Sequence, residues 1–399
     1  MPPKKPQPPM MMKTQTNQNS SRREFLRRLS IGTAAVASGI SLVARAQQPS
    51  PAPTPQKSGE KKKLGVALLG LGRYATNELA PALQITKNCE LVGAVSGHPE
   101  KLAAWQKQYN LPDKNLYSYH TMDRLADNPD IDIVYVVTPP ELHPVYAIRA
   151  ANAGKHVISE KPMATTPDDC QAMIDACKAA NRKLSVGYRL HFDPYFLEIG
   201  RLAKEEGPFM KMTGDRSFVF GNRAWRVDKI LGGGGPMMDL GIYLVQAACA
   251  AAGEVAPVAV TAKQRSKTRP ELFYDVEETL DFTLEFPNGA KFVGVTSFNH
   301  SSDTFRAENE SGKGFIDFQA HAFSYGPGTV VTDKGPLQFP RQPQVDGKNC
   351  YQQAWHMDNF ADCILNNREC VASGEMGLRD IKITSAVYEA MRTGQKVMV

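Results

Sequence analysis

The sequence predicts an α/β protein with two folded parts: a doubly wound parallel sheet, followed by an α+β part built on an open, mainly antiparallel sheet. Apolar strand-like runs alternate with helical stretches between residues 64 and 188. Beyond residue 188, strand-like runs follow one another with turn signals such as Pro287-Asn288-Gly289 between them. Alternating strands and helices indicate a parallel sheet, whereas consecutive strands indicate an antiparallel one.

The first 46 residues have the order of an export signal of the twin-arginine kind. Ser21-Arg22-Arg23-Glu24-Phe25-Leu26 lies in a basic segment, an apolar stretch covers residues 29–43, and Ala44-Arg45-Ala46 is a small-x-small cleavage site. We expect the twin-arginine export machinery to carry the folded protein to the periplasm, with cleavage near Ala46. The apolar stretch is shorter than a membrane span of ~20 residues, so we expect no stable membrane anchor. A disordered basic tail is the alternative.

The positive net charge of the chain belongs to this segment. Residues 1–46 hold eight Lys and Arg side chains and one acid, a net charge of +7, whereas the whole chain carries +6. The mature protein would therefore carry −1. The basic composition is thus no sign of a nucleic-acid partner.

Three stretches follow the signal. Residues 47–63 are rich in proline and poor in apolar residues, which indicates an extended arm or linker. Residues 64–188 hold the parallel part, with strands expected at 64–69, 90–95, 131–138, 156–159 and 184–187 and helices at 99–109, 143–153 and 167–181. Residues 189–399 hold the second part, with strands at 258–264, 279–286, 290–298 and 314–318 and helices at 236–251, 351–366 and 376–392. We expect the last two helices to pack back across the molecule. The uncovered face of the second sheet predicts a homo-oligomer, either a dimer or a tetramer.

The seven cysteines are an odd number and include no Cys-x-x-Cys pair. An oxidising compartment would allow disulfides, but the odd count and folding before export favour free, buried thiols. Cys170 and Cys177 are two helical turns apart, a spacing typical of core residues rather than metal ligands. We therefore predict no metal site.

The turn Gly70-Leu71-Gly72-Arg73-Tyr74-Ala75 predicts a dinucleotide site of the Rossmann kind. It directly follows the first strand and opens a helix. Gly70 permits the tight turn, Gly72 lets the backbone approach a pyrophosphate, and Ala75 is small enough for close packing of helix on strand. The N-terminus of the helix faces the phosphates. A glycine turn without a ligand is the alternative.

The end of the second strand favours NADP over NAD. An NAD site places Asp or Glu there for the ribose hydroxyl, whereas this chain has Ser96, with Lys101 in the first turn of the next helix. Ser96 can donate to a 2′-phosphate and Lys101 can pair with its charge. We expect Glu100 to point to solvent. An ordinary surface lysine is the alternative for Lys101.

Two further strand ends face the same crevice, because ligands of doubly wound sheets lie at the carboxyl ends of the strands. They are residues 138–143 (TPPELH) and 160–163 (EKPM). His143 is either a cofactor contact or a helix-start residue packed on its neighbours.

Lys161, Asp239 and Tyr243 are the candidate catalytic residues. Asp239 and Tyr243 are four residues apart on one helix face, after a glycine run at 232–235 that we expect to let backbone approach substrate or cofactor. A free tyrosine has a pKa of about 10, too high for a base at neutral pH. A neighbouring Lys161 ammonium would lower it. We predict that Tyr243 is the acid/base at an alcohol or carbonyl oxygen, that Lys161 assists it, and that Asp239 orients the lysine or the sugar hydroxyls. A core aromatic and a helix-start acid are the alternatives for Tyr243 and Asp239.

Together these motifs resemble the Gfo/Idh/MocA oxidoreductase family. The matching stretches run in order from residue 64 to 399: GLGRYA, TPPELH, EKPM, GYRLHFDP, WRVDKILGGGGPMMDLGIY and SGEMGLRDIKITSAVYEAMRTGQ. The export signal, Ser96 with Lys101, and the stretch that ends in MDLGIY are most similar to the periplasmic glucose–fructose oxidoreductase branch. Inositol-type members carry histidine where Tyr243 stands, so the tyrosine favours this branch.

The resemblance implies hydride transfer between a glucose-like aldose and tightly bound NADP, which a second, fructose-like sugar reoxidises. It implies that Lys161, Asp239 and Tyr243 are the family's catalytic lysine, aspartate and tyrosine. It also implies that the proline-rich arm reaches a neighbouring subunit at the adenine end of the cofactor. Arg73 departs from the aromatic residue that is frequent in the family's glycine loop. The residues expected to contact the cofactor are Gly70, Leu71, Gly72, Arg73, Tyr74, Ser96, Lys101, Tyr119, Thr138, His143, Glu160, Lys161, Arg189, Trp225 and Arg226.

Two other functions remain open. An exported glycosidase of this fold, which oxidises its substrate transiently with NAD(P), would carry a histidine-bearing glycine motif near the active helix. Residues 232–235 contain no histidine, which ranks this function lower. A catalytically silent sugar- or cofactor-binding protein would lack Lys161 or Tyr243, and both are present.

Overall fold

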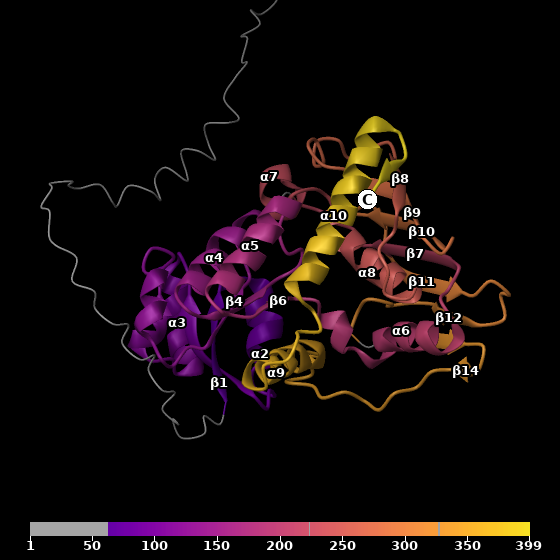
Figure 1. The fold of residues 1–399 in the computed structure, drawn as a ribbon. Helices are drawn as coiled ribbons and strands as arrows, with labels where there is room; N and C mark the ends of the chain where they lie inside the picture. The colour runs from indigo at the N-terminus through magenta and orange to yellow at the C-terminus, as the bar shows by residue number, and fades with distance from the viewer. Residues whose placement is uncertain (1–62, 223, 326–327) are drawn as a thin grey trace, which may run out of the picture. The chain divides into compact units, whose positions relative to one another are not determined.

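The computed structural model describes residues 63–222, 224–325 and 328–399. The predicted signal (1–46) and the predicted arm, apart from Lys63, lie outside these residues. The described part of the chain holds two β-sheets, one after the other in the sequence (Figure 1).

The first sheet has six parallel strands in the order β3-β2-β1-β4-β5-β6. Every residue of β1 is buried, because parallel sheets have both faces covered. This strand order is that of the Rossmann fold, in which ligands bind where the order reverses, beside β1 and β4. The strands are β1 (Leu64–Leu69), β2 (Cys89–Val95), β3 (Leu116–Tyr117), β4 (Ile133–Val136), β5 (His156–Ser159) and β6 (Leu184–Val186).

The connections in this part follow local sequence signals. The α5 helix begins after Thr166, whose hydroxyl accepts a hydrogen bond from the Asp169 backbone, and α3 ends at Asn110 in the left-handed conformation. The glycine loop leads into a π-helical turn, a rare form that often marks functional sites. The connections are η1 (Ala75–Leu79), α2 (Ala80–Ala82), α3 (Pro99–Tyr109), η2 (Asp113–Asn115), η3 (Met122–Asp127), η4 (Pro140–Leu142), α4 (His143–Asn152) and α5 (Pro167–Ala179).

The second sheet has nine strands in the order β14-β13-β12-β11-β7-β10-β9-β8-β15. Strands β7 and β10 run parallel, and all other neighbours run antiparallel. The predicted fold class is therefore confirmed. The strands are β7 (Lys211–Ser217), β8 (Ala259–Gln264), β9 (Thr279–Glu285), β10 (Lys291–Ser297), β11 (Ser302–Glu308), β12 (Phe315–Phe318), β13 (Val330–Thr332), β14 (Gly335–Pro336) and β15 (Val397–Met398).

One face of the second sheet is covered by helices, and the helix that carries Asp239 and Tyr243 lies among them. This helix starts as a π-helical turn, η7 (Met237–Gly241), and continues as α8 (Ile242–Ala251). Every residue of both segments is buried, because α8 packs on β7 and β11 and on its neighbour α6 (Pro194–Glu206). The remaining elements are η5 (Arg189–Phe192), η6 (Trp225–Val227) and α7 (Lys229–Gly232).

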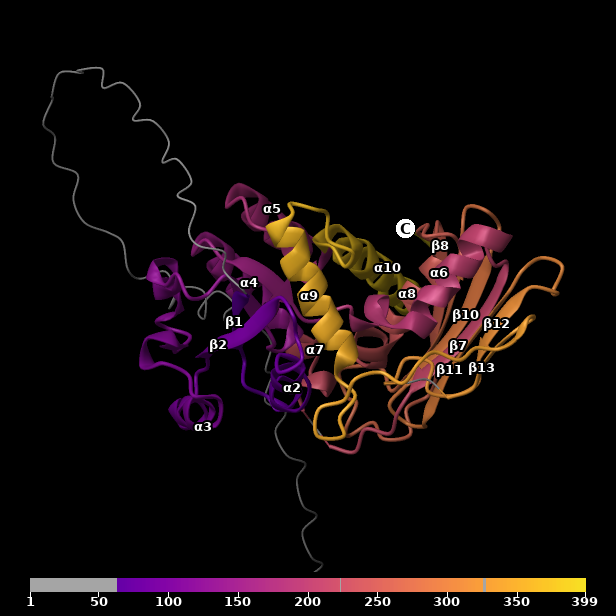
Figure 2. The same ribbon diagram turned by 90° about the horizontal axis from the view of Figure 1, so that it is seen from below.

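The two terminal helices join the halves of the chain. The α9 helix (Tyr351–Leu365) packs on the first sheet, where Met357 and Phe360 share a core with β1 and α2. The α10 helix (Gly374–Thr393) contacts both α5 and β8 and lies between the two sheets (Figures 1 and 2). Both helices thus contact elements of the first part of the chain. Their contacts hold the first sheet in place against the second part.

Strand β7 and helix α6 were not expected from the sequence. The β7 strand lies inside the sheet, paired with β10 and β11, yet its sequence, KMTGDRS, holds one apolar residue. Strand preference depends on the packing and pairing partners of a segment more than on its own residues. The position of β7 between two partners therefore overrides its polar composition.

All seven cysteines are free, and six of them are buried. Burial raises the pKa of the Cys170 and Cys177 thiols to about 12, so both are protonated and poorly reactive at neutral pH. This agrees with the expected core role of the pair. No helix in the part of the chain that the structure describes is both long and apolar enough to cross a membrane.

The docking of α9 is testable through Phe360, which is 1% exposed in the core shared with the first sheet. Phe360→Ala is expected to lower the free energy of unfolding by about 3–5 kcal/mol, because it removes buried ring contacts and leaves a cavity. Leu365→Ala, on the same helix but 56% exposed, is the control and should change it by about 0.5 kcal/mol or less. Urea denaturation measures both variants. Similar losses in the two would contradict the docking of α9.

Candidate active site

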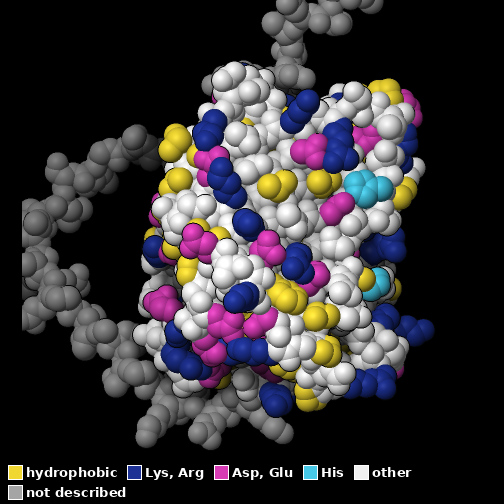
Figure 3. All heavy atoms as spheres, turned by 90° about the vertical axis from the view of Figure 1, so that its right-hand side faces the viewer, with side chains coloured by type: hydrophobic (Ala, Val, Ile, Leu, Met, Phe, Trp, Pro, Cys, Tyr) yellow, Lys and Arg dark blue, Asp and Glu magenta, His cyan; other side chains and the backbone are white. Residues whose placement is uncertain are grey.

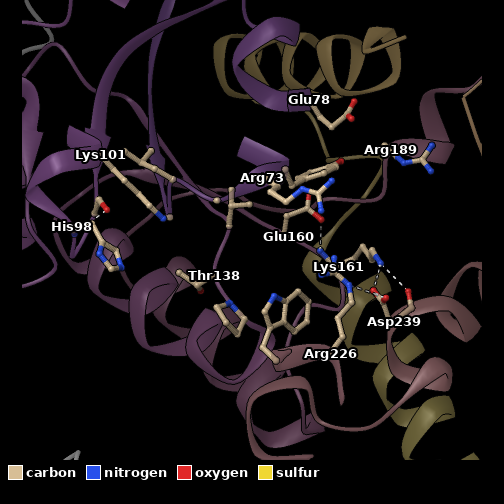
Figure 4. A pocket seen from close by; sticks show the side chains of 18 of the residues that line it. Arg73, Glu78, His98, Lys101, Thr138, Glu160, Lys161, Arg189, Arg226 and Asp239 are labelled. Carbon is tan, nitrogen blue, oxygen red and sulfur yellow. Dashed lines mark hydrogen bonds and ion pairs between the residues drawn. The ribbon is translucent and has the colours of Figure 1, made fainter. Parts of the chain in front are cut away.

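A cavity of about 580 Å³ opens at the carboxyl ends of the first sheet's strands and reaches the helix that carries Tyr243. Every predicted site residue except His143 lines it. In Figure 4, Lys101 and His98 lie at one end of the cavity, and Lys161, Asp239 and Arg226 lie together at the other. The residues that line it are Gly70, Leu71, Gly72, Arg73, Tyr74, Glu78, Ser96, His98, Lys101, Tyr119, Val137, Thr138, Pro139, Glu160, Lys161, Arg189, Trp225, Arg226, Asp239, Tyr243 and Tyr325.

The glycine loop fits a dinucleotide. Gly70 has a φ of +98°, and a Cβ atom there would lie 2.5 Å from the Val137 carbonyl oxygen, so only glycine fits without strain. A Cβ atom on Gly72 would meet nothing within 4 Å, so the space over this residue is open. Gly70 thus serves the turn itself, whereas Gly72 leaves room for a ligand beside the backbone.

The end of the cavity beside β2 holds the residues predicted to select NADP. Ser96 is buried, and its hydroxyl accepts a hydrogen bond from the His98 backbone. Glu100 is 70% exposed and pairs with the exposed His98 ring, so it points to solvent as expected. The Lys101 side chain is exposed and lines the cavity. A polar hydroxyl and an exposed cation therefore flank this end.

Tyr119 and Arg73 also lie where the sequence places them. The Tyr119 ring covers Gly97, where a Cβ atom would come within 2.9 Å of it, and stacks on Tyr146 at 4.8 Å between ring centroids. Arg73 is exposed at the cavity, next to Gly72. Both residues are positioned to touch a ligand, and their roles in cofactor binding stay predictions.

Lys161, Asp239 and Arg226 form a hydrogen-bonded cluster at the other end of the cavity. The Lys161 ammonium donates to the Asp239 carboxylate at 3.0 Å and to its carbonyl oxygen at 2.8 Å. Arg226 Nε donates to the second carboxylate oxygen at 3.1 Å. The Lys161 ammonium lies 4.7 Å from the centroid of the Tyr243 ring. One carboxylate thus holds two cations, one of which faces the tyrosine.

The charges around this cluster raise the pKa of Lys161 and lower the pKa of Tyr243, which is the direction that proton transfer through Tyr243 needs. Burial by itself would lower the pKa of Lys161, but Asp239 and Tyr243 outweigh it and raise that pKa, so the ammonium stays charged. Burial would raise the pKa of Tyr243, but Lys161, Arg189 and Arg216 outweigh it and lower that pKa below 10. The phenolate of Tyr243 is therefore more accessible than that of a free tyrosine.

Arg189 lines the cavity and is fixed in place. Its guanidinium donates to the Phe323 carbonyl oxygen at 2.6 Å and to the Gln352 side chain, and it lies 4.4 Å from the Tyr325 ring centroid. It is 5.6 Å from the Tyr243 ring centroid. Its position therefore places a second cation beside Tyr243, in addition to the cofactor contact that the resemblance implies.

Glu160 stays buried beside the cluster. Its carboxylate accepts hydrogen bonds from the Tyr135 hydroxyl at 2.8 Å and from the Lys161 backbone at 3.0 Å. A Cβ atom on Gly187 would lie 2.5 Å from this carboxylate, so glycine there makes room for it. Burial raises the pKa of Glu160. This carboxylate therefore links the ends of β4 and β5 beneath the cavity.

The predicted role of the glycine run at 232–235 is wrong. None of these glycines lines the cavity. A Cβ atom on Gly234 would clash with the Tyr388 hydroxyl, and one on Gly235 with the Glu277 backbone. The Glu277 carboxylate accepts hydrogen bonds from the Gly235 and Met237 backbones at 3.0 and 2.9 Å. The run therefore lets the start of the helix that carries Asp239 and Tyr243 approach Glu277, which caps it.

The prediction of His143 as a cofactor contact is also wrong. His143 is fully buried outside the cavity lining, with its ring nitrogens 2.9 Å from the Pro162 carbonyl oxygen and 2.7 Å from that of Thr138. Burial lowers its pKa to about 4, so the ring is neutral. The neutral ring has one N–H, so it donates to one of these carbonyls and packs against the other, between the loops that follow β4 and β5, as the packing alternative held.

Five residues that line the cavity were missed by the sequence reasoning. Glu78 lies one turn beyond the glycine loop, on the same π-helical turn, and its pKa is raised by burial. Tyr325 comes from a long loop after β12, and its pairing with Arg189 has no local sequence signal. The other three continue motifs that were recognised. The missed residues are Glu78, His98, Val137, Pro139 and Tyr325.

The fold and the site together define a nucleotide-dependent oxidoreductase. The glycine loop and the Lys161–Tyr243 pair open on one cavity, as a site for transfer of a hydride and a proton requires. Within residues 63–399, the two short gaps aside, no group of three or more His, Cys, Asp and Glu side chains is placed to hold a metal ion.

Comparisons with known proteins identify the family. Residues 64–188 match the family described as an oxidoreductase family with an NAD-binding Rossmann fold, GFO_IDH_MocA, and residues 198–315 match a C-terminal domain of the same family. The solved aldose–aldose oxidoreductase of Caulobacter crescentus is 39% identical with a TM-score of 0.79, over 84% of this chain and 100% of that chain. The chain belongs to the Gfo/Idh/MocA oxidoreductase family, and it is an NAD(P)-dependent oxidoreductase that acts on sugars.

Curated relatives are more distant. The D-xylose 1-dehydrogenase (NADP(+)) of Haloarcula marismortui is 29% identical over 83% of this chain and 92% of its own length. The D-glucoside 3-dehydrogenase of Escherichia coli is 26% identical over 84% of this chain and 97% of its own length. The relatives thus differ in the sugar position that their names specify.

The two glycines give a test of cofactor binding that separates folding from ligand contact. Gly72→Ala is expected to leave the unfolding temperature unchanged but to weaken NADP binding about tenfold or more, equal to about 1.4 kcal/mol, because its methyl group enters the open space. Gly70→Ala is expected to lower the unfolding temperature, since its Cβ atom meets the Val137 carbonyl. Calorimetric titration and thermal unfolding measure both. Unchanged NADP affinity in Gly72→Ala would place the pyrophosphate elsewhere.

Proposed function

We propose that this protein is an exported, NADP-dependent sugar oxidoreductase that oxidises a glucose-like aldose at C1 and reduces a second sugar with cofactor that stays bound. The observation that carries the proposal is Tyr243, held at the cavity by Lys161 and with a lowered pKa. The name of the relative at 39% identity, an aldose–aldose oxidoreductase, supports an aldose as the first substrate. It also favours an aldose over fructose as the second sugar.

Oxidation of an aldose at C1 removes one hydride and one proton. When bound, the oxidised nicotinamide supplies the acceptor for the hydride. The Tyr243 phenolate takes the proton from the C1 hydroxyl, so the C1–O bond becomes a carbonyl and the product is a lactone. The Lys161 ammonium stabilises the negative charge on this oxygen as the proton leaves. In the reverse direction, the Tyr243 phenol returns the proton to the carbonyl oxygen of the second sugar.

Asp239 and Arg226 set the position of the lysine. The Asp239 carboxylate accepts from both cations, so it fixes the ammonium at 4.7 Å from the Tyr243 ring centroid. Burial would raise the pKa of Asp239, but Lys161 and Arg226 outweigh it and lower that pKa. Asp239 therefore stays ionised and acts as the orienting group of the site.

Two features support NADP. Lys101 lies at the cavity end beside the loop after β2 (Figure 4), and Ser96 is buried in that loop. A cation there suits a 2′-phosphate. The name of the relative from Haloarcula marismortui specifies NADP(+). We propose the same preference for this protein.

We also propose export to the periplasm and assembly into a homo-oligomer. The export proposal rests on the twin-arginine motif at residues 21–26 and the cleavage site at 44–46. The oligomer proposal rests on the uncovered face of the second sheet, where Arg265 pairs with Asp281 and Arg306 with Asp317. Figure 3, viewed from the side on which this sheet lies, shows basic and acidic side chains interspersed. Such a surface suits a second copy of the chain, because its own charges are complementary.

The proposal predicts a cofactor that two sugars reduce and reoxidise in turn. The purified mature protein, loaded with one equivalent of NADP, is mixed with glucose, and the near-ultraviolet absorbance and fluorescence of reduced nicotinamide are followed. Addition of a second aldose, or of fructose, after glucose is removed should return the spectrum to its first state. Gel filtration before each addition shows that the cofactor stays with the protein.

Tyr243→Phe is the matched variant for this experiment, because it removes the hydroxyl and keeps the ring. It should bind NADP as the parent does and reduce it about 10²–10⁴ times more slowly. Tyr274→Phe, a tyrosine that is 63% exposed, is the control and should behave as the parent. Bound cofactor that no aldose reduces would overturn the proposed substrate. Full activity in Tyr243→Phe would overturn the assignment of the acid/base.

A further inference from the structure

Arg216 lies behind the ring of Tyr243, and so far only its charge has entered the description of the site. It comes from β7 and points to the covered face of the second sheet, the face on which Leu244 of α8 packs against Gly214. The carbon of its guanidinium is 5.8 Å from the centroid of the Tyr243 ring. Its side chain is 16% exposed, and it is absent from the residues that line the cavity.

Asp303 of β11 holds this arginine in place. Arg216 Nη1 lies 2.6 Å from the Asp303 carboxylate. The same carboxylate accepts hydrogen bonds from the Phe323 backbone at 3.0 Å and from the Ser324 hydroxyl at 2.6 Å. The Phe323 ring stacks on Tyr243 at 6.2 Å between centroids. One largely enclosed carboxylate, 12% exposed, therefore fixes both the cation behind Tyr243 and the aromatic ring that packs on it.

The backbone at Arg216 is also tied to the start of the catalytic helix. The Thr296 hydroxyl lies 3.0 Å from the carbonyl oxygens of both Arg216 and Pro236. Pro236 directly precedes the π-helical turn that leads to Tyr243. The distance from Arg216 to Tyr243 is thus set by the sheet and by the helix start, and not by a mobile side chain alone.

Charged and titratable groups face Tyr243 from several elements. The cations are Lys161 beyond β5, Arg189 of η5 and Arg216 of β7. The groups of opposite effect are Glu160 at the end of β5 and the phenols of Tyr135 and Tyr325. Asp239 lies on the same helix and binds Lys161. Of these three cations, Lys161 and Arg189 line the cavity, whereas Arg216 lies on the side of the Tyr243 ring that faces the protein interior.

We propose that Arg216 is a positioning residue that acts on the reaction through Tyr243, by holding a fixed positive charge behind the phenol ring and so favouring the phenolate. The proposal rests on the proposed acid/base role of Tyr243. Arginine suits this place because one guanidinium nitrogen can bind Asp303 while the delocalised charge of the group stays against the ring face. Lysine would keep a charge but has a single nitrogen for both contacts.

The test uses Arg216→Gln and Arg216→Lys in the NADP-loaded protein. The rate of cofactor reduction by an aldose in a single turnover is measured against pH. Because oxidation needs the phenolate, the rate rises with pH up to the pKa of Tyr243 and then levels off. Arg216→Gln should move this rise upward by about one pH unit, so that the rate on the rising limb falls about tenfold while the plateau is kept. Arg216→Lys should move it less.

Arg201→Gln is the matched control, because Arg201 on α6 pairs with Glu198 as Arg216 pairs with Asp303, and it does not line the cavity. Its pH profile should equal that of the parent. Arg216→Met, which keeps an apolar stem of similar length, repeats the test should Arg216→Gln not fold. A rise at the parent's pH in the folded Arg216 variants would overturn the proposal, and so would a lowered plateau with an unmoved rise.

A second readout needs no sugar and separates this inference from the proposed function. Tyrosinate absorbance is titrated in the parent, in Tyr243→Phe and in Arg216→Gln. The tyrosine that is missing from Tyr243→Phe should ionise at a higher pH in Arg216→Gln than in the parent. A parent that reduces no cofactor with any aldose overturns the proposed substrate and leaves this titration as the test of Arg216. An unmoved titration overturns the role of Arg216.

Discussion

The contact between the Lys161 ammonium and Asp239 is the interaction on which the rest of the site depends. Lys161 follows β5 of the first sheet, whereas Asp239 belongs to the helix that packs on the second sheet. Their side chains are 14% and 10% exposed, so each charge has lost most of its water. A buried charge is tolerated when it is paired and hydrogen-bonded, and removal of one partner is strongly destabilising. This one contact therefore aligns the two halves of the chain and also places both charges in the site.

The scaffold around the pair resists movement of the catalytic helix. Glu277 caps the start of this helix, and the Tyr388 hydroxyl of α10 donates to Glu277 at 2.9 Å. Burial raises the pKa of Glu277, and its hydrogen bonds from the backbone lower it in part. Because α10 also packs on α5 of the first part, the helix that carries Tyr243 is held in position relative to both sheets. Tyr243 and Lys161 thus keep their distance although they come from different parts of the fold.

Local patterns in the sequence were enough to predict the first sheet, the glycine loop and the meeting of Lys161, Asp239 and Tyr243 at one cavity. Strand β1 is a continuous apolar run, and Gly70 and Gly72 carry a spacing with a known geometric reason. The failures share one cause. His143 and the glycine run look like ligand contacts in sequence, but their partners are protein groups brought close by the fold, such as the Pro162 carbonyl and Glu277. Local sequence does not reveal whether such a residue contacts a ligand or another group of the protein.

Residues that act over long sequence separations were missed for the same reason. Arg216 meets Tyr243 through the pairing of β7 with β11, and β7 itself carries no alternating apolar pattern. Tyr325 meets Arg189 through the loop that joins β12 to β13. The electrostatic setting of Tyr243 is therefore a property of the assembled fold.

The most direct test of this account is the pH dependence of single-turnover aldose oxidation in Lys161→Met, measured in protein already loaded with NADP. If the Lys161 ammonium lowers the pKa of Tyr243, the rise in rate should move to higher pH than in the parent, and the rate at neutral pH should fall while alkaline solution restores much of it. If the rate instead rises at the same pH as in the parent, the account is contradicted, because the Lys161 ammonium would then not lower the pKa of Tyr243.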